Sequence, residues 1–236
     1  MKVVVIIPAA GLGTRMAPAS GKPAASKQFV DLNGVPILIR TLRRFAAAPE
    51  VAEIYLALRK PEAESFLPRL EQEKLGKPVH VVEGGESRQE SVANALAAVR
   101  ATADDIVLVH DAVRPLIDRE IIANVIGAAE KYGAAIAGWP AQDTIKQVER
   151  TAEGAVITST IPRERVVLAQ TPQGFRFGLL KQAFDDAQAD GFVGTDEASL
   201  VERAGHEVAV VMGSPRNIKI TTPADLELAE FYVRKG

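Results

Sequence analysis

The stretch "IIPAAGLGTRM", residues 6–16, places two glycines and an arginine directly after an apolar run. A glycine turn that leads from a first strand towards a helix presents backbone N–H groups to an anion. Arg15 adds a fixed cation there, and its planar fork of donors suits phosphate oxygens. Lys27 follows a loop rich in proline, glycine and alanine and is placed to close over the same anion. We interpret the turn as a polyphosphate site.

Two better-known glycine motifs do not fit this turn. Gly11 and Gly13 match the start of the dinucleotide fingerprint, but Met16 stands where that motif needs glycine or alanine for close helix–strand packing. The P-loop pattern fails because no Gly-Lys-Ser/Thr follows. An NAD-dependent oxidoreductase is therefore disfavoured. On the glycines alone, a tight structural turn without a ligand stays open.

Asp111 is the second candidate for chemistry, in the segment "VLVHDAVRP" (107–115). It follows a predicted central strand, and ligands of open α/β sheets bind beyond the carboxyl ends of strands. A carboxylate there suits Mg²⁺ held by few protein ligands and several phosphate oxygens. The alternative is an aspartate that caps a turn. We expect His110 to be structural, and His80 and His206 have no spacing that indicates chemistry.

The elements that position these residues follow from short apolar runs alternating with amphipathic ones. Buried strands that alternate with helices predict a Rossmann-like, doubly wound, mostly parallel α/β sheet. A capping box is indicated where Ser87 is followed by Glu90, and Asp118 and Gly133 are typical of the two ends of a helix. The expected strands are 3–7, 53–58, 79–82 and 105–110, and the expected helices between them are 36–47, 61–74, 87–100 and 118–133.

The alternation ends after about Trp139. Residues 144–161 form two β-rich runs around "RTAEG", which predicts a hairpin arm at about 140–165 that projects from the sheet. Helices are expected again at 177–188 and 196–205, and Thr222 is the expected cap of the last one. We expect residues 1–236 to form one domain.

Composition bounds the function further. The chain has 236 residues, 47% of them hydrophobic, with a formal charge of −2, which argues against a general nucleic-acid or membrane binder. It contains no cysteine, which excludes disulfides, thiol nucleophiles and thiolate metal sites. The apolar run Val3–Ala10 is too short to span a membrane. We expect a cytoplasmic protein.

Six further segments accompany "PAAGLGTRM" and "SKQF" in order along the chain. Together they resemble the 2-C-methyl-D-erythritol 4-phosphate cytidylyltransferases, a nucleotidyltransferase family of the non-mevalonate isoprenoid pathway. The resemblance covers nearly the whole chain. The segments are "VVEGGESRQESV" (81–92), "VLVHDAVRP" (107–115), "DTIK" (143–146), "AQTPQGF" (169–175), "TDEASLVE" (195–202) and "NIKITTPADLELAE" (217–230), after the opening turn and "SKQF".

The resemblance implies that CTP and methylerythritol phosphate react to give the CDP-alcohol and pyrophosphate, with Mg²⁺ on Asp111. It also implies a homodimer through the arm, in which Arg163 reaches the partner subunit's site. The implied catalytic residues are Arg15, Lys27, Arg163 and Lys219. The implied nucleotide-binding residues are Pro8, Ala9, Ala10, Gly11, Gly13, Gly85, Glu86 and Ser91, and the implied substrate-binding residues are Thr144, Arg163, Thr171 and Thr195.

Two other functions remain open on the sequence. Ribitol 5-phosphate cytidylyltransferases are very similar, and both substrates are short polyol phosphates. A catalytically silent nucleotide-binding regulator on the same fold is the second. The joint presence of Arg15, Lys27, Asp111 and Lys219 argues against such a regulator, which has no physical need for all four.

Overall fold

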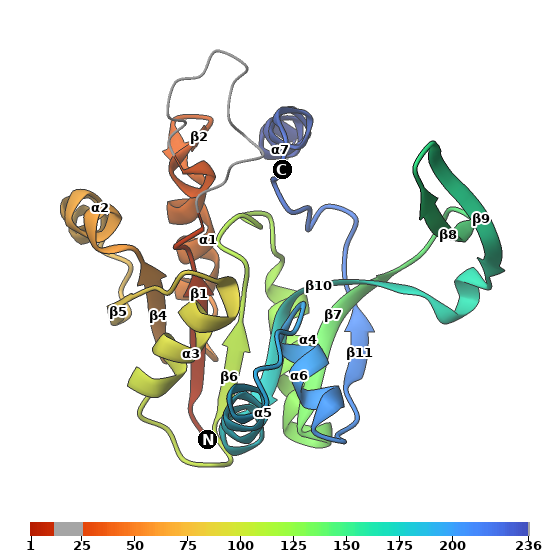
Figure 1. The fold of residues 1–236 in the computed structure, drawn as a ribbon. Coiled ribbons are helices and arrows are strands. Elements are labelled where there is room, and N and C mark those ends of the chain that lie inside the picture. Colours follow the sequence, from red (N-terminus) through yellow and green to blue (C-terminus); the bar gives the residue numbers. More distant parts are fainter. Residues whose placement is uncertain (12–25, 236) are drawn as a thin grey trace.

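A seven-stranded sheet forms the centre of the computed structural model, which describes residues 1–11 and 26–235 (Figure 1). The strand order is β11-β7-β10-β6-β1-β4-β5, and neighbouring strands are parallel except where β10 pairs antiparallel with β6 and β7. The predicted mostly parallel α/β fold is confirmed. The strands are β1 (Val3–Pro8), β4 (Glu53–Leu58), β5 (Val79–Glu83), β6 (Ile106–Val109), β7 (Ala134–Pro140), β10 (Val167–Arg176) and β11 (Ala209–Met212).

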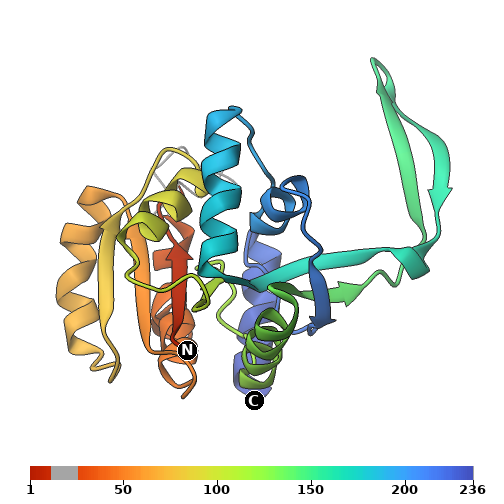
Figure 2. The same cartoon turned by 90° about the horizontal axis from the view of Figure 1, so that it is seen from below.

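Alternate side chains of β1 enter two separate hydrophobic clusters, because successive residues of a strand point to opposite faces. Val5 and its neighbours on one face join the cluster that contains α1, α2 and α4, whereas Ile6 joins the cluster that contains α3, α5 and α6. Figure 2 shows helices on both faces of the sheet. The helices are α1 (Ile37–Ala46), α2 (Lys60–Gln72), α4 (Arg119–Tyr132), α3 (Arg88–Ala98), α5 (Phe177–Ala189) and α6 (Glu197–Arg203).

A third, smaller cluster ties the end of the chain to the segment after β6. Ile220 is buried with Val113 and Leu32, and the backbone N–H of Ile220 donates to the Val113 carbonyl at 2.9 Å. This cluster fixes Lys219 beside the segment that follows β6. The cluster includes Leu32 of the strand β2 (Asp31–Leu32) and Ala229 of α7 (Pro223–Lys235). The short helix η2 (Lys27–Phe29) and the strand β3 (Val35–Pro36) lie next to β2 in the sequence. In residues 1–11 and 26–235, no helix has the length and apolar character that a membrane span requires.

The predicted helix caps are partly confirmed. The Ser87 hydroxyl accepts from the backbone N–H of Glu90 at 3.0 Å, but the Glu90 carboxylate accepts from Glu86 and not from Ser87, so the box is half formed. Asp118 and Gly133 are the N-cap and C-cap residues of α4, as predicted, although Asp118 makes no side-chain cap hydrogen bond. Thr222 and Asp225 exchange side-chain bonds with each other's backbone N–H, as the expected start of α7 requires.

Strand β10 is absent from the sequence-based prediction, although it lies between β6 and β7. Its segment contains Pro172, which cannot donate to a sheet, so the pattern did not indicate a strand. The structure resolves the conflict with an irregularity between Ala169 and Gln173, where the register shifts and Pro172 needs no sheet partner. Tertiary pairing on both sides then outweighs the weak local preference.

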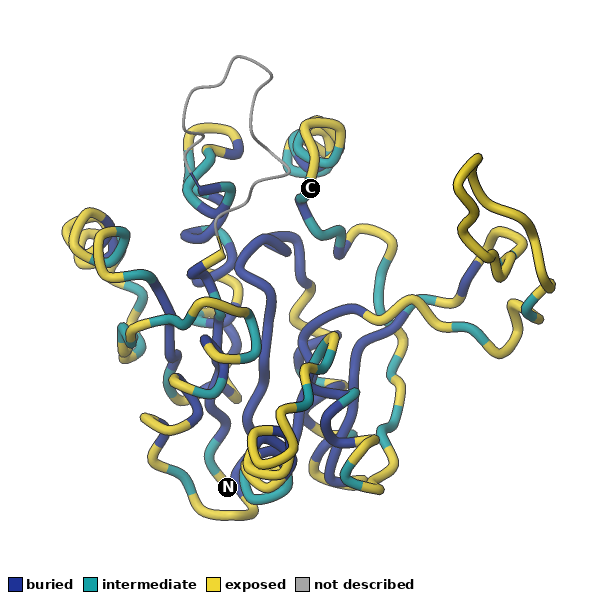
Figure 3. The backbone as a smooth tube through the Cα atoms, in the orientation of Figure 1, coloured by how far each residue is buried: buried dark blue, intermediate teal, exposed yellow. Residues whose placement is uncertain are grey.

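The hairpin arm is present and projects away from the sheet (Figures 1 and 3). It consists of β8 (Ile145–Thr151) and β9 (Gly154–Ile161), which pair only with each other within the described residues. Val148, Val156 and Ile157 are 49%, 58% and 58% exposed. An isolated two-stranded hairpin is at best marginally stable in water. The arm therefore presents apolar side chains that a single subunit leaves uncovered.

Candidate active site

A cavity of about 270 Å³ lies at the carboxyl ends of β1 and β6. The chain runs from β1 to β4 and β5 on one side and returns to β6 on the other, so this is the topological switch point where such folds bind ligands. Its walls come from segments far apart in sequence. They are Pro8, Ala9, Ala10 and Gly11; Lys27 and Gln28; Gly85, Glu86, Ser87, Arg88 and Ser91; Asp111, Ala112 and Val113; and Lys219.

The segment after β1 is held against its neighbours by backbone contacts. The Ala9 N–H donates to the Ala57 carbonyl at 2.8 Å, and Gln28 donates through Nε2 to the Ala9 carbonyl at 2.6 Å. A Cβ on Gly84 would lie 2.4 Å from the Ala10 Cβ, so only glycine permits this approach. The loops after β1 and β5 therefore form one continuous wall.

Hydrogen bonds between its own residues hold the conformation of the turn at residues 85–91. The Gly85 N–H donates to the Ser91 hydroxyl at 3.0 Å, and the Glu86 N–H donates to the Glu90 carboxylate at 2.8 Å. A Cβ on Gly85 would lie 2.2 Å from the Glu90 Cγ, so glycine makes room for this carboxylate. Ser91 is buried and also donates to the Ser87 carbonyl at 2.9 Å. In this structure, Ser91 holds the shape of the nucleotide-binding turn that the resemblance implies.

Asp111 is the electrostatic centre of the cavity. Its Oδ1 accepts from Arg88 Nε at 3.2 Å, and its Oδ2 lies 3.3 Å from Arg114 Nε and 3.0 Å from Lys219 Nζ. Burial alone would raise the pKa of the Asp111 carboxyl, but the cations Arg88, Lys219 and Arg114 outweigh burial and hold that pKa well below its usual range. Asp111 is therefore an anion at any physiological pH.

A relay of hydrogen bonds fixes the segment after β6 in place. The Asp111 N–H donates to the Thr171 hydroxyl at 3.0 Å, and His110 Nε2 lies 3.1 Å from the Arg114 carbonyl. Burial lowers the pKa of His110 to about 4, so the ring is neutral at pH 7. Because a carbonyl only accepts, Nε2 carries the proton, and Nδ1 accepts from the Thr171 hydroxyl at 3.1 Å. His110 is structural, as the sequence predicted.

We expect Thr171→Val to lower the free energy of unfolding by roughly 1–3 kcal/mol, because it leaves the buried Asp111 N–H without its acceptor. Thr171→Ser keeps the hydroxyl and is expected to retain most of the stability. Urea unfolding of the parent and both variants measures this. Equal stability of the valine and serine variants would contradict the structural role of the hydroxyl.

The structure brings together ten of the predicted site residues and places four elsewhere. Arg163 is half-exposed and donates to the Gln142 carbonyl at 2.9 Å. Gln142 precedes the arm in the sequence and Arg163 follows it. Thr144 and Thr195 are exposed, and Thr171 lies buried behind Asp111. None of these four is among the residues that line the cavity, and their predicted substrate contacts stay predictions. Gly13 and Arg15 lie outside the described residues.

Sequence reasoning missed Arg88, Gln28 and Glu197. Arg88 donates through its two terminal nitrogens to Glu197, at 2.7 and 2.9 Å, and through Nε to Asp111. Glu197 is 1% exposed, and a carboxylate is almost never buried so fully unless it is paired, as Glu197 is with Arg88. Arg88 lies in the first turn of α3, where a charged residue is expected to be exposed to solvent. No local sequence pattern indicates that its partner is Glu197, 109 residues away.

Mg²⁺ fits this cavity as a cation that brings its own phosphate ligands. In the described part of the chain, no cluster of three or more potential metal-ligating side chains occurs, so an all-protein metal cage is not built there. Mg²⁺ binds through one or two carboxylates together with substrate phosphates and water. Asp111 supplies one carboxylate, and its Oδ2 is paired with Lys219, a residue of the cavity wall.

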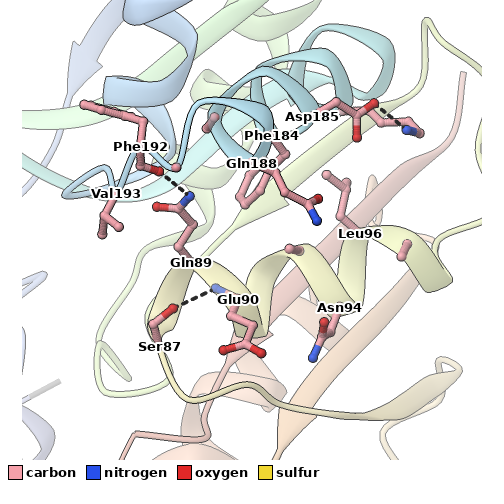
Figure 4. Close-up of a pocket in the computed structure, with 15 residues that line it drawn as sticks. Ser87, Gln89, Glu90, Asn94, Leu96, Phe184, Asp185, Gln188, Phe192 and Val193 are labelled. Atoms are coloured by element: carbon pink, nitrogen blue, oxygen red, sulfur yellow. Dashed lines mark hydrogen bonds and ion pairs between the residues drawn. The ribbon is translucent and has the colours of Figure 1, made fainter.

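A second cavity, of about 600 Å³, lies on another side of α3, between α3 and α5 (Figure 4). Leu96, Phe184 and Phe192 give it a largely apolar lining. Gln89 spans one end, where its amide nitrogen donates to the Phe192 carbonyl at 3.1 Å. The cavity contains neither Asp111 nor Lys219, so we assign the chemistry to the smaller one.

Comparison with known proteins decides the family. Residues 3–235 match the family model described as IspD, 2-C-methyl-D-erythritol 4-phosphate cytidylyltransferase. The chain belongs to the IspD family. A protein of that name from Acidobacterium capsulatum is 62% identical over 100% of this chain and 98% of its own length. One from Solibacter usitatus is 52% identical over 100% of this chain and 97% of its own length.

Solved IspD structures share the fold. The 2-C-methyl-D-erythritol 4-phosphate cytidylyltransferase of Thermus thermophilus is 35% identical, with a TM-score of 0.77, over 99% of this chain and 100% of that one. The 4-diphosphocytidyl-2C-methyl-D-erythritol synthase of Anaerococcus prevotii reaches a TM-score of 0.83 at 28% identity, over 99% and 96%. The family resemblance seen in the sequence motifs is therefore confirmed.

Proposed function

We propose that this IspD-family chain transfers the cytidylyl group of CTP to 2-C-methyl-D-erythritol 4-phosphate, releasing pyrophosphate. The observation that carries the proposal is the cavity at the switch point, where Lys219 pairs with an ionised, buried Asp111 and Lys27 lines the same cavity. Cations around a carboxylate suit a site that receives phosphates. A cytoplasmic location and the absence of a nucleic-acid partner stay predictions.

The substrate phosphate is the nucleophile, and it is already an anion near neutral pH. The oxygen of the phosphate monoester attacks the α-phosphorus of CTP, and the bond to the leaving pyrophosphate breaks. The chain has no need of a general base, so its side chains act by placing two polyanions and stabilising charge. Both Lys219 and Lys27 line the cavity; Lys219 would place the incoming phosphate, and Lys27 would contact the nucleotide phosphates. Arg15, outside the described residues, joins them on the sequence argument.

Asp111 is the residue that would hold Mg²⁺, which when bound supplies charge neutralisation on the phosphates of CTP. Lys219, whose Nζ lies 3.0 Å from Asp111 Oδ2, is the residue that would contact the substrate phosphate. Arg88 and Arg114 remain to hold the carboxylate in place.

Turnover with purified substrates tests the proposal. We expect pyrophosphate release with CTP, methylerythritol phosphate and Mg²⁺, loss of it when EDTA is added, and little release when ribitol 5-phosphate or UTP replaces its counterpart. A site that hydrogen-bonds one base leaves polar groups unpaired with another, at roughly 1–3 kcal/mol each. Faster turnover with ribitol 5-phosphate would favour the alternative cytidylyltransferase. Nucleotide binding without any turnover would indicate a silent regulator.

We also propose that the enzyme is a homodimer whose arms cover each other. The support is the exposed apolar surface of Val148, Val156 and Ile157, continued at the root of the arm by Val167 and Leu168, which are 42% and 52% exposed. Burying such residues against a second copy would stabilise the dimer by about 25 cal/mol per Å² of apolar area removed from water. Arg163 follows the arm directly, so a partner's arm would carry it to the other subunit's site.

Mixing Arg163→Ala and Arg15→Ala proteins tests whether sites are shared. Each hybrid dimer then has one site with both residues intact and one with neither. Random exchange of subunits is expected to restore about a quarter of the parental activity, because half the dimers are hybrid. Subunit exchange is checked with a tagged copy. No recovery after demonstrated exchange would assign Arg163 to its own subunit.

A further inference from the structure

The guanidinium of Arg88 uses all three of its nitrogens within the protein. Its terminal nitrogens make a two-pronged ion pair with Glu197, at 2.7 and 2.9 Å, and its Nε reaches Asp111 Oδ1 at 3.2 Å. Two parallel bonds fix the plane of a guanidinium as well as its position. The ion pair with Glu197 therefore orients Arg88 so that its Nε edge points towards Asp111.

Both members of this pair are anchored by their own elements. Gln173 of β10 donates to the Asp196 carboxylate at 2.7 Å and accepts from the Ala198 N–H at 3.1 Å, so it clamps the first turn of α6 on either side of Glu197. Gln89, next to Arg88, donates to the Phe192 carbonyl at 3.1 Å (Figure 4). It also accepts from the Gly194 N–H at 2.9 Å. The spacing between α3 and α6 is therefore fixed.

The two carboxylate oxygens of Asp111 differ in how firmly their partners are held by other residues. Oδ1 faces Arg88, which Glu197 holds. Oδ2 faces Arg114, which donates to the Asn217 carbonyl at 2.7 Å, and Lys219, whose side chain is 37% exposed and lines the cavity. Lys219 is the partner that a divalent cation can replace.

We propose that Glu197 is a positioning residue for the metal-binding carboxylate. Acting through Arg88, it limits that arginine to one hydrogen bond on Oδ1 and so keeps Oδ2 available for exchange between Lys219 and a divalent cation. This inference rests on the proposed role of Asp111 in binding Mg²⁺. Without Glu197, the fork of Arg88 turns towards Asp111 and competes for both of its oxygens.

The test measures how much a metal ion strengthens nucleotide binding. Calorimetry gives the affinity for CTP with Mn²⁺ and for CTP in EDTA, and the ratio of the two is the metal contribution. Partners of metal ligands typically change metal affinity 10–100-fold when mutated. We expect Glu197→Gln to lower the metal contribution by about tenfold or more, and to raise the Mg²⁺ concentration needed for half-maximal turnover. Affinity for CTP in EDTA should change little.

Two further variants separate positioning from folding. Glu197→Asp keeps the charge with a shorter reach and is expected to restore part of the metal contribution. Arg203→Gln removes an exposed ion pair that α6 makes with Asp190, away from Glu197, and should change thermal stability slightly without changing the metal contribution. An unchanged metal contribution in Glu197→Gln, with Asp111→Asn losing it, would overturn the role of Glu197. If the parent and Asp111→Asn show equal metal contributions, the role of Asp111 itself is wrong, and this inference fails with it.

Discussion

Asp111→Asn is expected to lower turnover by about 10²–10³-fold, because the cavity loses the anion that receives a metal and organises its cations. The effect should be greatest at low Mg²⁺ and should appear mainly in kcat. Steady-state kinetics over a range of Mg²⁺ concentrations measures it. A parental kcat at ordinary Mg²⁺ would show that Asp111 is not the ligand.

The same substitution also affects folding, which the sequence alone did not indicate. Asp111 is buried against Arg88 and Arg114, and removing one partner of a buried ion pair costs roughly 3–5 kcal/mol. Kinetics must therefore be measured well below the melting temperature of the variant. Asp185→Asn is a suitable control, since that carboxylate is exposed and pairs only with Lys181 among the described residues.

Lys219→Met is expected to lower kcat/KM for the polyol phosphate by about 10²-fold, with a smaller change in the KM for CTP. Methionine keeps much of the aliphatic stem and removes the charge that places the phosphate. The fold should survive, because Asp111 retains Arg88 and Arg114.

Lys219→Arg is the matched control for charge, and thermal melting checks the fold of both variants. An equal loss in the arginine and methionine variants would point to shape rather than charge. An unchanged kcat/KM for the polyol phosphate in Lys219→Met would remove Lys219 from the substrate site.

The first half of the fold was predictable because its strands and helices have regular hydrophobic patterns. The site at the end of β6 followed from the same pattern, since parallel strands direct their carboxyl ends to one edge. Strand β10 was not predictable, because Pro172 and Gly174 argue against a strand and only two flanking strands decide otherwise.

The polar framework behind the site was also beyond the sequence. Arg88 and Glu197 are 109 residues apart in the sequence. Thr171, whose hydroxyl accepts a hydrogen bond from the Asp111 N–H, is 60 residues from Asp111. No local pattern encodes such distances. The structural role that the sequence assigned to His110 is confirmed by its two buried hydrogen bonds.

The root of the arm has a consequence for how this protein can be altered. Trp139 pairs with Leu168 and Pro140 with Val167, so the chain leaves the sheet and re-enters it at adjacent positions. The Ala141 N–H continues this contact to the Val166 carbonyl at 3.1 Å. A segment whose two ends already touch is exchangeable without new closure of the chain. The arm is thus a module that can be redesigned, shortened or transplanted while the central sheet keeps its register.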